Sequence, residues 1–326
     1  MKPILNFTVR ALRKIIGNKS RHHPLKYYAY VDLYDQQANN YIGNFLTDKN
    51  CGGKMISKFG SIELGNIVAA HYELHHWTQD FFKDTMHYNA SFDLYRMLKM
   101  LCSNAGFFPY DLSLGIKYYE RMLQDMPEID VLGSYVYEEK YVNQFLIGVK
   151  KRVNLDGFYA PFMWKNPWTR VLAGKRVLVV HPFVESIRYQ YENNRTKIWN
   201  DPDVLPKFKE LLTLKAVQSI ADSKDQPYKD WFGALKYMED EISKMDFDIA
   251  IIGCGAYGMC LAAHVKRMGK IAIHLAGWTQ MLFGVYGNRW IKDQPEYAKF
   301  INEYWIRPNK NERPKGAEKV ENGCYW

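Results

Sequence analysis

The stretch 247–258, Phe-Asp-Ile-Ala-Ile-Ile-Gly-Cys-Gly-Ala-Tyr-Gly, constrains the fold of this chain more than any other part of the sequence. Residues 248–252 are almost entirely apolar and partly β-branched, which predicts a short buried parallel strand. Glycines in G-x-G-x-x-G spacing follow, then residues 259–268 with helical character, and Gly269 is placed to end that helix. A second apolar strand is predicted over residues 270–275. The stretch therefore predicts a β-turn-α-β unit within an α/β fold, a Rossmann-like open and mostly parallel sheet flanked by helices.

The glycines of this turn, Gly253, Gly255 and Gly258, admit two interpretations. Glycines let the backbone approach a phosphate closely, and the helix N-terminus after them offers free N–H groups to an anion. They also let a helix pack tightly against a strand without any ligand. A dinucleotide is the less expected ligand, because the second strand ends in His274 and the apolar residues 275–277, without the carboxylate that holds a ribose hydroxyl. The unit also comes late in the chain, which leaves little room for the other strands of a dinucleotide-binding fold.

The composition is that of a globular protein with an anionic partner. Hydrophobic residues make up 47% and charged residues 24% of the 326 residues, which is the balance of an ordinary folded domain. The formal net charge of +9 indicates a phosphate-bearing substrate, a nucleic acid or an acidic lipid surface. No run of about 18 apolar residues is present, so no membrane-spanning segment is predicted. We expect a cytoplasmic protein with reduced thiols, because no C-x-x-C pair occurs among Cys51, Cys102, Cys254, Cys260 and Cys324.

The N-terminal residues 1–24 combine apolar and basic side chains. Apolar residues recur at helical spacing among arginines and lysines, namely at Leu5, Val9, Leu12 and Ile16. The apolar core is too short for a secretory signal. The predicted helix either lies on the anionic inner face of a membrane or docks on the protein's own body. We expect residues 1–50 to form a basic amphipathic N-terminal extension.

A second strand–turn–helix segment places a carboxylate at the start of a helix. A strand is predicted over residues 55–59, followed by a turn at Gly60 and a helix over residues 62–72 with Ser61 as its N-cap. Glu63 lies in the first turn of that helix. Its negative charge either only complements the helix dipole or gives the residue a role in a functional site.

A third strand ends in a histidine. The apolar run before His181 is the clearest strand outside the glycine-rich unit, and ligands of open α/β sheets bind at the carboxyl ends of the strands. Glu185, Arg188 and Arg195 follow it. The arginines either bind a phosphate bidentately or belong to an ordinary solvated loop.

Several other segments are read from pattern alone. Residues 230–244 predict an amphipathic helix that leads directly into the strand at 248. Residues 204–218 form an element whose type the pattern does not decide. The aromatic, glycine-punctuated residues 278–290 predict a loop near the ligand. The charged residues 308–326 predict a mobile tail.

His71 and His75 have the i, i+4 spacing that can hold a metal ion on one helix face. No third ligand follows at a suitable spacing. The pair therefore does not predict a metal site.

Four motifs, in their order along the chain, resemble the GT-D type glycosyltransferases, bacterial enzymes of surface polysaccharide and glycoprotein assembly. The motifs are Lys-Phe-Gly-Ser-Ile-Glu-Leu at 58–64, Val-Leu-Val-Val-His-Pro-Phe at 177–183, the glycine-rich stretch at 251–258 and Ala-Ile-His-Leu-Ala-Gly at 272–277. The resemblance covers roughly residues 50–290. It implies one domain over 51–307 that transfers a hexose from a nucleotide-sugar, usually a UDP-sugar, to a hydroxyl of a glycan or lipid-linked acceptor.

The resemblance also implies a role for individual residues. Members of the family hold Mn²⁺ or Mg²⁺ and the diphosphate with two carboxylates; Glu63 matches the second, and Ser61 stands where the first would be. Glu63 therefore either works with another metal ligand, or cations such as the two arginines offset the diphosphate charge. Candidates for the base that deprotonates the acceptor are Glu63, His181 and Glu185. The residues expected to bind the nucleotide-sugar are Lys58, Gly60, Ser61, Arg188, Arg195, Gly253, Gly255, Ala256, Tyr257, Gly258, His274 and Gln280.

Three other classes of function were weighed. An S-adenosylmethionine-dependent methyltransferase has a similar glycine-rich first motif, but early in its domain and followed by an acidic residue. A catalytically impaired nucleotide- or sugar-binding scaffold of a polysaccharide assembly complex is favoured by Ser61. A nucleic-acid binder is indicated only by the net charge, and no DNA or RNA motif is visible, so no nucleic-acid partner is expected.

Overall fold

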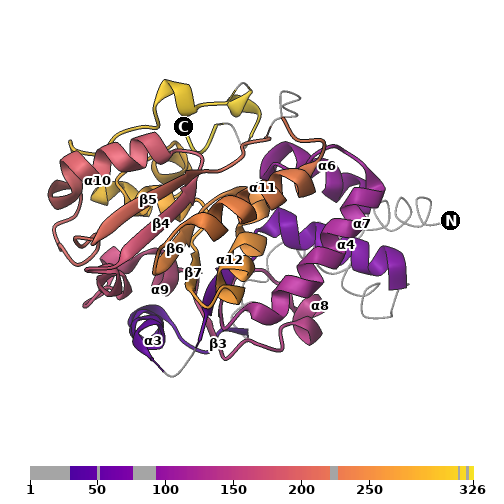
Figure 1. Ribbon diagram of the computed structural model, residues 1–326, viewed down its shortest axis with the longest axis horizontal. Helices are drawn as coiled ribbons and strands as arrows, with labels where there is room; N and C mark the ends of the chain where they lie inside the picture. The colour runs from indigo at the N-terminus through magenta and orange to yellow at the C-terminus, as the bar shows by residue number, and fades with distance from the viewer. Residues whose placement is uncertain (1–29, 50–51, 76–92, 221–226, 315, 321–322) are drawn as a thin grey trace, which may run out of the picture.

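The computed structural model describes residues 30–49, 52–75, 93–220, 227–314, 316–320 and 323–326, which form one all-parallel sheet flanked by helices (Figure 1). The strand order is β3-β2-β1-β7-β6-β4-β5, so the expected α/β, Rossmann-like fold is confirmed. The strands are β1 (Lys54–Lys58), β2 (Val131–Gly133), β3 (Lys151–Val153), β4 (Arg176–His181), β5 (Glu210–Lys215), β6 (Ile249–Ile252) and β7 (Ile271–His274).

The glycine-rich unit lies at the centre of the sheet. β6 leads through η6 (Gly255–Tyr257) into α12 (Gly258–Arg267) and then β7. β7 pairs with β1 on one side and with β6 on the other, and β6 pairs with β4. The glycine-rich unit comes late in the sequence and is still part of a full sheet, because strands from earlier in the chain, β1 and β4, flank it on both sides.

Successive side chains of the central strands point to opposite faces of the sheet, and both faces are buried. Leu178 and Val180 of β4 belong to one hydrophobic cluster, whereas Val177 and Val179 belong to another. Figure 1 shows α11 and α12 in front of the strands. The first face is covered by α4 (Ser61–His75), α6 (Leu94–Ala105), α7 (Leu112–Asp125), α8 (Glu139–Val142), α11 (Trp231–Lys244) and α12. The second is covered by α3 (Asp35–Thr47), α9 (Leu155–Tyr159), α10 (Val184–Ile198) and α13 (Trp278–Leu282).

Short helical turns connect these elements. They are η2 (Met126–Glu128), η3 (Asn143–Phe145), η4 (Pro161–Met163), η5 (Trp168–Leu172), η8 (Pro295–Phe300), η9 (Lys310–Glu312), η10 (Ala317–Lys319) and one π-helical turn, η7 (Arg289–Asp293).

The described part of the expected N-terminal extension, residues 30–49, packs on the α/β body. Ala38, Ile42 and Leu46 of α3 are buried in the second hydrophobic cluster, and the backbone of Leu33 bridges to Val153 of β3. Residues 30–49 therefore pack on the α/β body, because α3 has an apolar face that lies against α9 and η5 in this cluster. The predicted amphipathic helix within 1–24 lies outside the described residues.

The segment expected to be a mobile tail, residues 308–326, contacts the α/β body through its described residues. The carboxylate of Glu312 is buried and accepts hydrogen bonds from the backbone N–H groups of Glu185 (2.8 Å) and Ser186 (3.2 Å). The residue that precedes α10, Phe183, supplies no side-chain cap. Glu312 therefore satisfies the first turn of α10 from the other end of the chain, and charged composition alone did not reveal this contact.

The structure also shows the secondary structure of two segments discussed above, residues 204–218 and 278–290. Residues 204–218, left undecided, contain β5, an edge strand whose partly exposed pattern explains the ambiguity. Residues 278–290, expected as a loop, begin with the fully buried helix α13. The aromatic residues there fill the core, as for Trp278, whose ring contacts that of Trp290.

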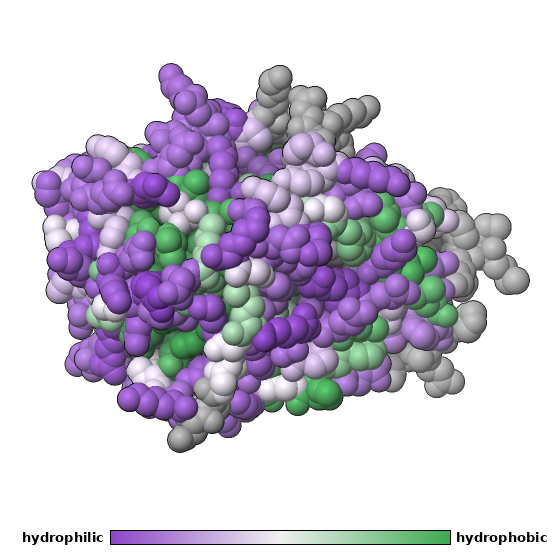
Figure 2. Space-filling view, viewed as in Figure 1, coloured by the Kyte–Doolittle hydropathy of each residue, from purple (hydrophilic) through white to green (hydrophobic). Residues whose placement is uncertain are grey.

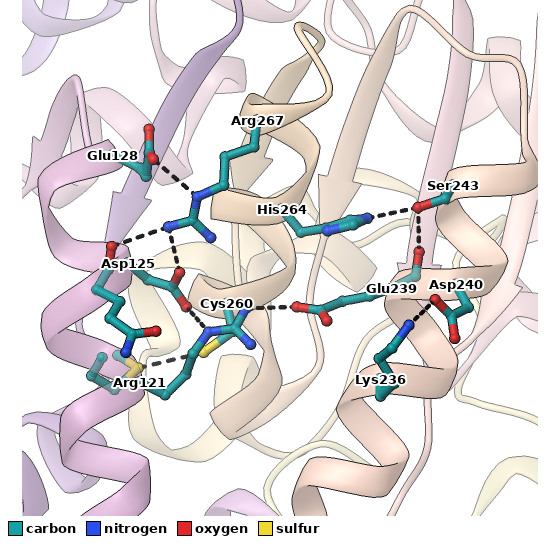
Figure 3. A network of polar contacts seen from close by, with 12 residues as sticks. Arg121, Asp125, Glu128, Lys236, Glu239, Asp240, Ser243, Cys260, His264 and Arg267 are labelled. Atoms are coloured by element: carbon teal, nitrogen blue, oxygen red, sulfur yellow. Dashed lines mark hydrogen bonds and ion pairs between the residues drawn. The ribbon is translucent and has the colours of Figure 1, made fainter.

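An ionic network joins three helices on the first face (Figure 3). Arg121 of α7 lies between Asp125 on its own helix (2.7 Å) and Glu239 of α11 (2.6 Å). Arg267 at the end of α12 pairs with Asp125 (2.7 Å) and Glu128 (3.0 Å). Asp125 is fully buried and bridges two arginines, so the network holds α12, and with it the glycine turn, in a fixed position over the sheet.

A serine and a histidine in the same network do not form a nucleophilic site. The Ser243 hydroxyl donates its proton to the carbonyl oxygen of Glu239 at 2.8 Å, and Nε2 of His264 lies 2.9 Å from the same hydroxyl (Figure 3). With its only proton donated to the backbone, Ser243 accepts from the imidazole instead of transferring a proton to it. The contact therefore packs α11 against α12.

The described helices include none that is long and apolar enough to cross a membrane. Hydrophilic side chains cover most of the face seen in Figure 2, with hydrophobic residues in separate small patches. Nδ1 of His71 lies 2.8 Å from the Tyr119 hydroxyl, and burial, with His75 nearby, lowers the pKa of His71.

Candidate functional site

A cavity of about 350 Å³ opens at the carboxyl edge of the sheet. Its walls come from the segments that follow β1, β2, β4, β5, β6 and β7, together with the described end of the chain at Tyr325 and Trp326. Ligand sites of open α/β proteins lie at this edge, and the volume falls in the range of small-molecule sites. The cavity is therefore the candidate ligand site.

Most of the residues predicted for the site line this cavity. They are Lys58, Gly60, Ser61, Glu63, His181, Gly253, Gly255, Tyr257, His274 and Gln280. The motifs after β1, β4, β6 and β7, which are far apart in the sequence, thus meet at one place because the four strands are neighbours and parallel.

The remaining predicted residues lie outside the cavity lining. Ala256 and Gly258 belong to the buried backbone of the turn. On α10, Glu185 is exposed and lies 3.9 Å from Lys215, Arg188 hydrogen-bonds the Thr213 hydroxyl, and Arg195 donates to the carbonyl oxygen of Leu205 at 3.3 Å. The predicted arginine pair does not gather at this cavity, because successive turns of α10 direct its side chains toward β5 and its flanking residues.

Glu63 is the one carboxylate that lines the cavity among the described residues. It lies in the first turn of α4 and folds back over Gly60, since a Cβ atom added to Gly60 would lie 1.9 Å from Oε2 of Glu63. Its carboxylate makes no hydrogen bond or ion pair with the described part of the chain. A side chain at residue 60 would therefore displace the carboxylate of Glu63 from the position that it has over this turn.

Two histidines at the ends of the two strands that flank β6 are uncharged. His181 ends β4 and His274 ends β7, on either side of β6. Burial lowers the pKa of His181 to about 3; burial, together with the nearby Lys58 ammonium, lowers that of His274 to about 3. Nδ1 of His274 lies 3.0 Å from the Ser57 hydroxyl, and the backbone N–H of Phe183 donates to Nδ1 of His181 at 3.0 Å. Both rings are therefore neutral at physiological pH.

The three motif glycines are each required by contacts within the protein. A Cβ at Gly253 would lie 2.3 Å from the carbonyl oxygen of Ala276, and one at Gly258 would lie 2.2 Å from Nε2 of His274. Gly255 has a φ of 55°, and its Cβ would lie 2.5 Å from the carbonyl oxygen of Ala105. Helix–strand and loop packing thus explain the G-x-G-x-x-G spacing, and the spacing by itself is no evidence for a phosphate.

In its described lining, the cavity carries two cations, Lys58 and Arg289, beside the carboxylate of Glu63. Nζ of Lys58 lies 5.7 Å from the ring centre of Tyr135, and the guanidinium of Arg289 lies 4.5 Å from that of Tyr325. Both aromatic rings also line the cavity. The site therefore combines a net positive charge with aromatic walls, an arrangement that suits an anionic ligand with a planar group.

Sequence reasoning missed several contributors to the site, among them Tyr135 after β2, residues 104–106 at the end of α6, residues 217–220 after β5, Arg289, Tyr325 and Trp326. Tyr135 follows a strand of only three residues, and Tyr325 and Trp326 lie in the segment expected to be mobile. Only Arg289 had a sequence signal, since it lies within the aromatic stretch expected near the ligand.

In the part of the chain that the structure describes, the cavity does not hold a complete set of metal ligands from the protein alone. No group of three His, Cys, Asp or Glu side chains gathers around a possible metal position in the described ranges. At the positions where the resemblance implies two carboxylates, the cavity has the hydroxyl of Ser61 and the carboxylate of Glu63. Mg²⁺ takes about six ligands, and substrate phosphates often supply several of them.

A comparison of the chain with models of known protein families found no match, and comparisons with curated proteins and with solved structures found none either. Proposals about function therefore rest on the residues and geometry of the cavity.

Proposed function

We propose that this chain is a glycosyltransferase that moves a sugar from a nucleotide-sugar, with UDP as the expected nucleotide, to a hydroxyl acceptor. The observation that carries the proposal is the cavity at the carboxyl edge of the sheet, where a lone carboxylate, Glu63, shares the walls with Lys58, Arg289 and aromatic rings. The resemblance of four motifs to the GT-D type enzymes supports it, since the residues of those motifs that line the cavity come from four neighbouring strands.

In the proposed reaction each group has one task. The bond between the sugar's anomeric carbon and the diphosphate oxygen breaks, and a bond forms from that carbon to the acceptor oxygen. The acceptor's proton passes to the carboxylate of Glu63. The departing diphosphate carries the negative charge, which Lys58 and Arg289 stabilise electrostatically. No step is routed through a metal.

A second candidate is a nucleotide- or sugar-binding scaffold without transferase activity. The observation that favours it is Ser61, which stands where the resemblance implies a first carboxylate, beside a cavity with only one carboxylate in its described lining. The scaffold and the enzyme share the ligand and differ in whether Glu63 has a chemical role.

The acceptor and the cellular setting are parts of the same proposal. A glycan or lipid-linked acceptor in surface polysaccharide assembly follows from the motif resemblance. A cytoplasmic protein held peripherally at the inner membrane face follows from the basic residues within 1–24.

Calorimetric titration with UDP, GDP and CMP, each with and without Mn²⁺, tests the binding part of the proposal. We expect micromolar binding of one nucleotide, and a dependence on Mn²⁺ would mean that a cation accompanies the ligand's phosphates. NAD and S-adenosylmethionine are the matched alternatives. Binding of either one alone would contradict the proposal in favour of a dehydrogenase or a methyltransferase.

Glu63→Gln tests the chemical part. We expect this variant to bind the nucleotide while sugar transfer falls by about 100-fold or more, because general-base catalysis contributes roughly 10²–10⁴-fold. Glu185→Gln is the matched control on α10, outside the cavity lining, and should transfer normally. Full transfer by Glu63→Gln would remove Glu63 from the mechanism, and binding without transfer by the unmodified protein would favour the scaffold.

A further inference from the structure

The hydrogen-bonding state of His181 is fixed by the backbone beside it. The N–H of Phe183 donates to Nδ1 of His181 at 3.0 Å. A backbone N–H can only donate, so Nδ1 must carry a lone pair and not a proton. In the neutral ring the proton is then on Nε2.

The protonated edge of this ring is directed to the glycine turn. A Cβ atom at Gly253 would lie 2.9 Å from Cδ2 of His181, the ring atom next to Nε2. His181 is only 3% exposed and lines the cavity, yet Nε2 has no hydrogen-bond acceptor anywhere in the described ranges. Nε2 is not among the buried unpartnered atoms of the described residues, so it is accessible from the cavity, and a ligand there can supply its acceptor.

Further donors lie in the same turn. The backbone N–H groups of Cys254 and Gly255, which line the cavity, donate no hydrogen bond to a described residue, whereas that of Gly253 bonds the carbonyl oxygen of Val180 at 2.9 Å. These N–H groups and Nε2–H of His181 therefore form a set of uncharged donors around one turn.

We propose that His181 is a positioning residue that donates Nε2–H to a phosphoryl oxygen of the nucleotide, and that it does not take the acceptor's proton. This inference rests on the proposed function, because that function supplies the phosphate. A neutral donor stabilises the charge that develops on the departing diphosphate, and it does so without a change in its own protonation. The role of base then belongs to Glu63 alone among the three candidates, because Glu185 lies outside the cavity.

Two substitutions separate the ring's two nitrogens. In His181→Asn the short amide can still accept from the N–H of Phe183 but no longer reaches the ligand. In His181→Gln the longer amide places an N–H near the former position of Nε2. His264→Asn is the matched control, since His264 is a partly buried histidine that contacts Ser243 outside the cavity.

The experiment is calorimetric titration of each full-length variant with UDP and with uridine, from pH 5.5 to 8. We expect His181→Asn to weaken UDP binding by roughly 10- to 100-fold, the usual loss for a hydrogen bond to a charged group, while uridine binding is unchanged. His181→Gln and His264→Asn should bind UDP within about threefold of the unmodified protein. The ratio of the His181→Asn constant to that of the unmodified protein should not vary with pH, because no titration of His181 is involved.

Several results would overturn the inference. Normal UDP binding by His181→Asn, equal losses for UDP and uridine, or a ratio that changes across the pH range would each exclude a neutral donor to phosphate. Those outcomes leave the proposed function intact, because the unmodified protein still binds UDP. Failure of the unmodified protein to bind any nucleotide would overturn both. Thermal unfolding of each variant shows whether a loss of UDP binding is due to misfolding. If His181→Asn misfolds, the pH dependence of sugar transfer by the unmodified protein is measured instead. A transfer rate that falls with the titration of a histidine would contradict the inference.

Discussion

An uncharged histidine ring at the end of a strand links the acid stability of this protein to its site. His181 and His274 both have a pKa lowered to about 3, with burial as the largest cause. In the unfolded chain each would take up a proton near its ordinary pKa of about 6.5. Between these values the unfolded state binds more protons than the folded state, so the free energy of unfolding falls as the pH drops below about 6.5 and is unaffected above it.

We predict that His181→Asn reduces this pH dependence. On lowering the pH from 7 to 5, the unmodified protein should lose about 2 kcal/mol more stability than the variant, because one fewer histidine takes up a proton on unfolding. Urea unfolding at the two pH values measures the difference. Equal pH dependence in the two proteins would mean that His181 is protonated in the folded state, and would contradict its burial as an uncharged ring.

At the scale of the element, the N-terminus of α10 is occupied by a carboxylate of the protein itself. In an open α/β protein this helix follows a central strand and offers an anion site. Here the protein's own carboxylate, Glu312, occupies that site and is buried there. A phosphate is therefore excluded from the start of α10 and is left with the turn after β6.

We predict that Glu312→Ala destabilises the fold by about 1–3 kcal/mol, the cost of leaving buried donors without an acceptor. The N–H groups of Glu185 and Ser186 should exchange with solvent faster, and the described residues 309–326 should become more accessible to proteases. Hydrogen exchange followed by mass spectrometry measures both effects. The exposed Glu318, on the same segment, is the matched control for substitution by Ala. Unchanged exchange in Glu312→Ala would mean that water caps the helix equally well.

The elements that the sequence predicted are those whose pattern is local. β4, β6 and α11 lie within a residue or two of their predicted ranges, because apolar runs and a 3.6-residue period leave few alternatives. The contact of Glu312 with α10 spans more than a hundred residues, so no local pattern encodes it. The same reason hid Tyr325 and Trp326 from the predicted site, although the motif residues of the central strands were placed correctly at its edge.

At the scale of the whole molecule, the order of the strands determines which residues meet. The chain builds β1, β2 and β3 outward on one side, then β4 and β5 at the other edge, and fills the gap with β6 and β7. A single sequence predicts parallel strands but not this order, because the pairing of β7 with β1 joins segments more than two hundred residues apart. The cavity lies where the two halves join, so its walls depend on both.

This arrangement leads to a prediction about ligand-linked stability. A nucleotide that fills the cavity touches segments after β1 and β4 and the described end of the chain, so it should stabilise all of them together. At a UDP concentration about 100 times its dissociation constant, the free energy of unfolding should rise by about 2.7 kcal/mol. Backbone amides of residues 217–220 and 323–326 should gain additional protection from hydrogen exchange, whereas the network around Arg121 should change only as far as global stability does. A ligand in this cavity would cover residues 217–220 as well as Tyr325 and Trp326. A rise in stability without slower exchange in these two segments would therefore mean that the nucleotide binds elsewhere on the molecule.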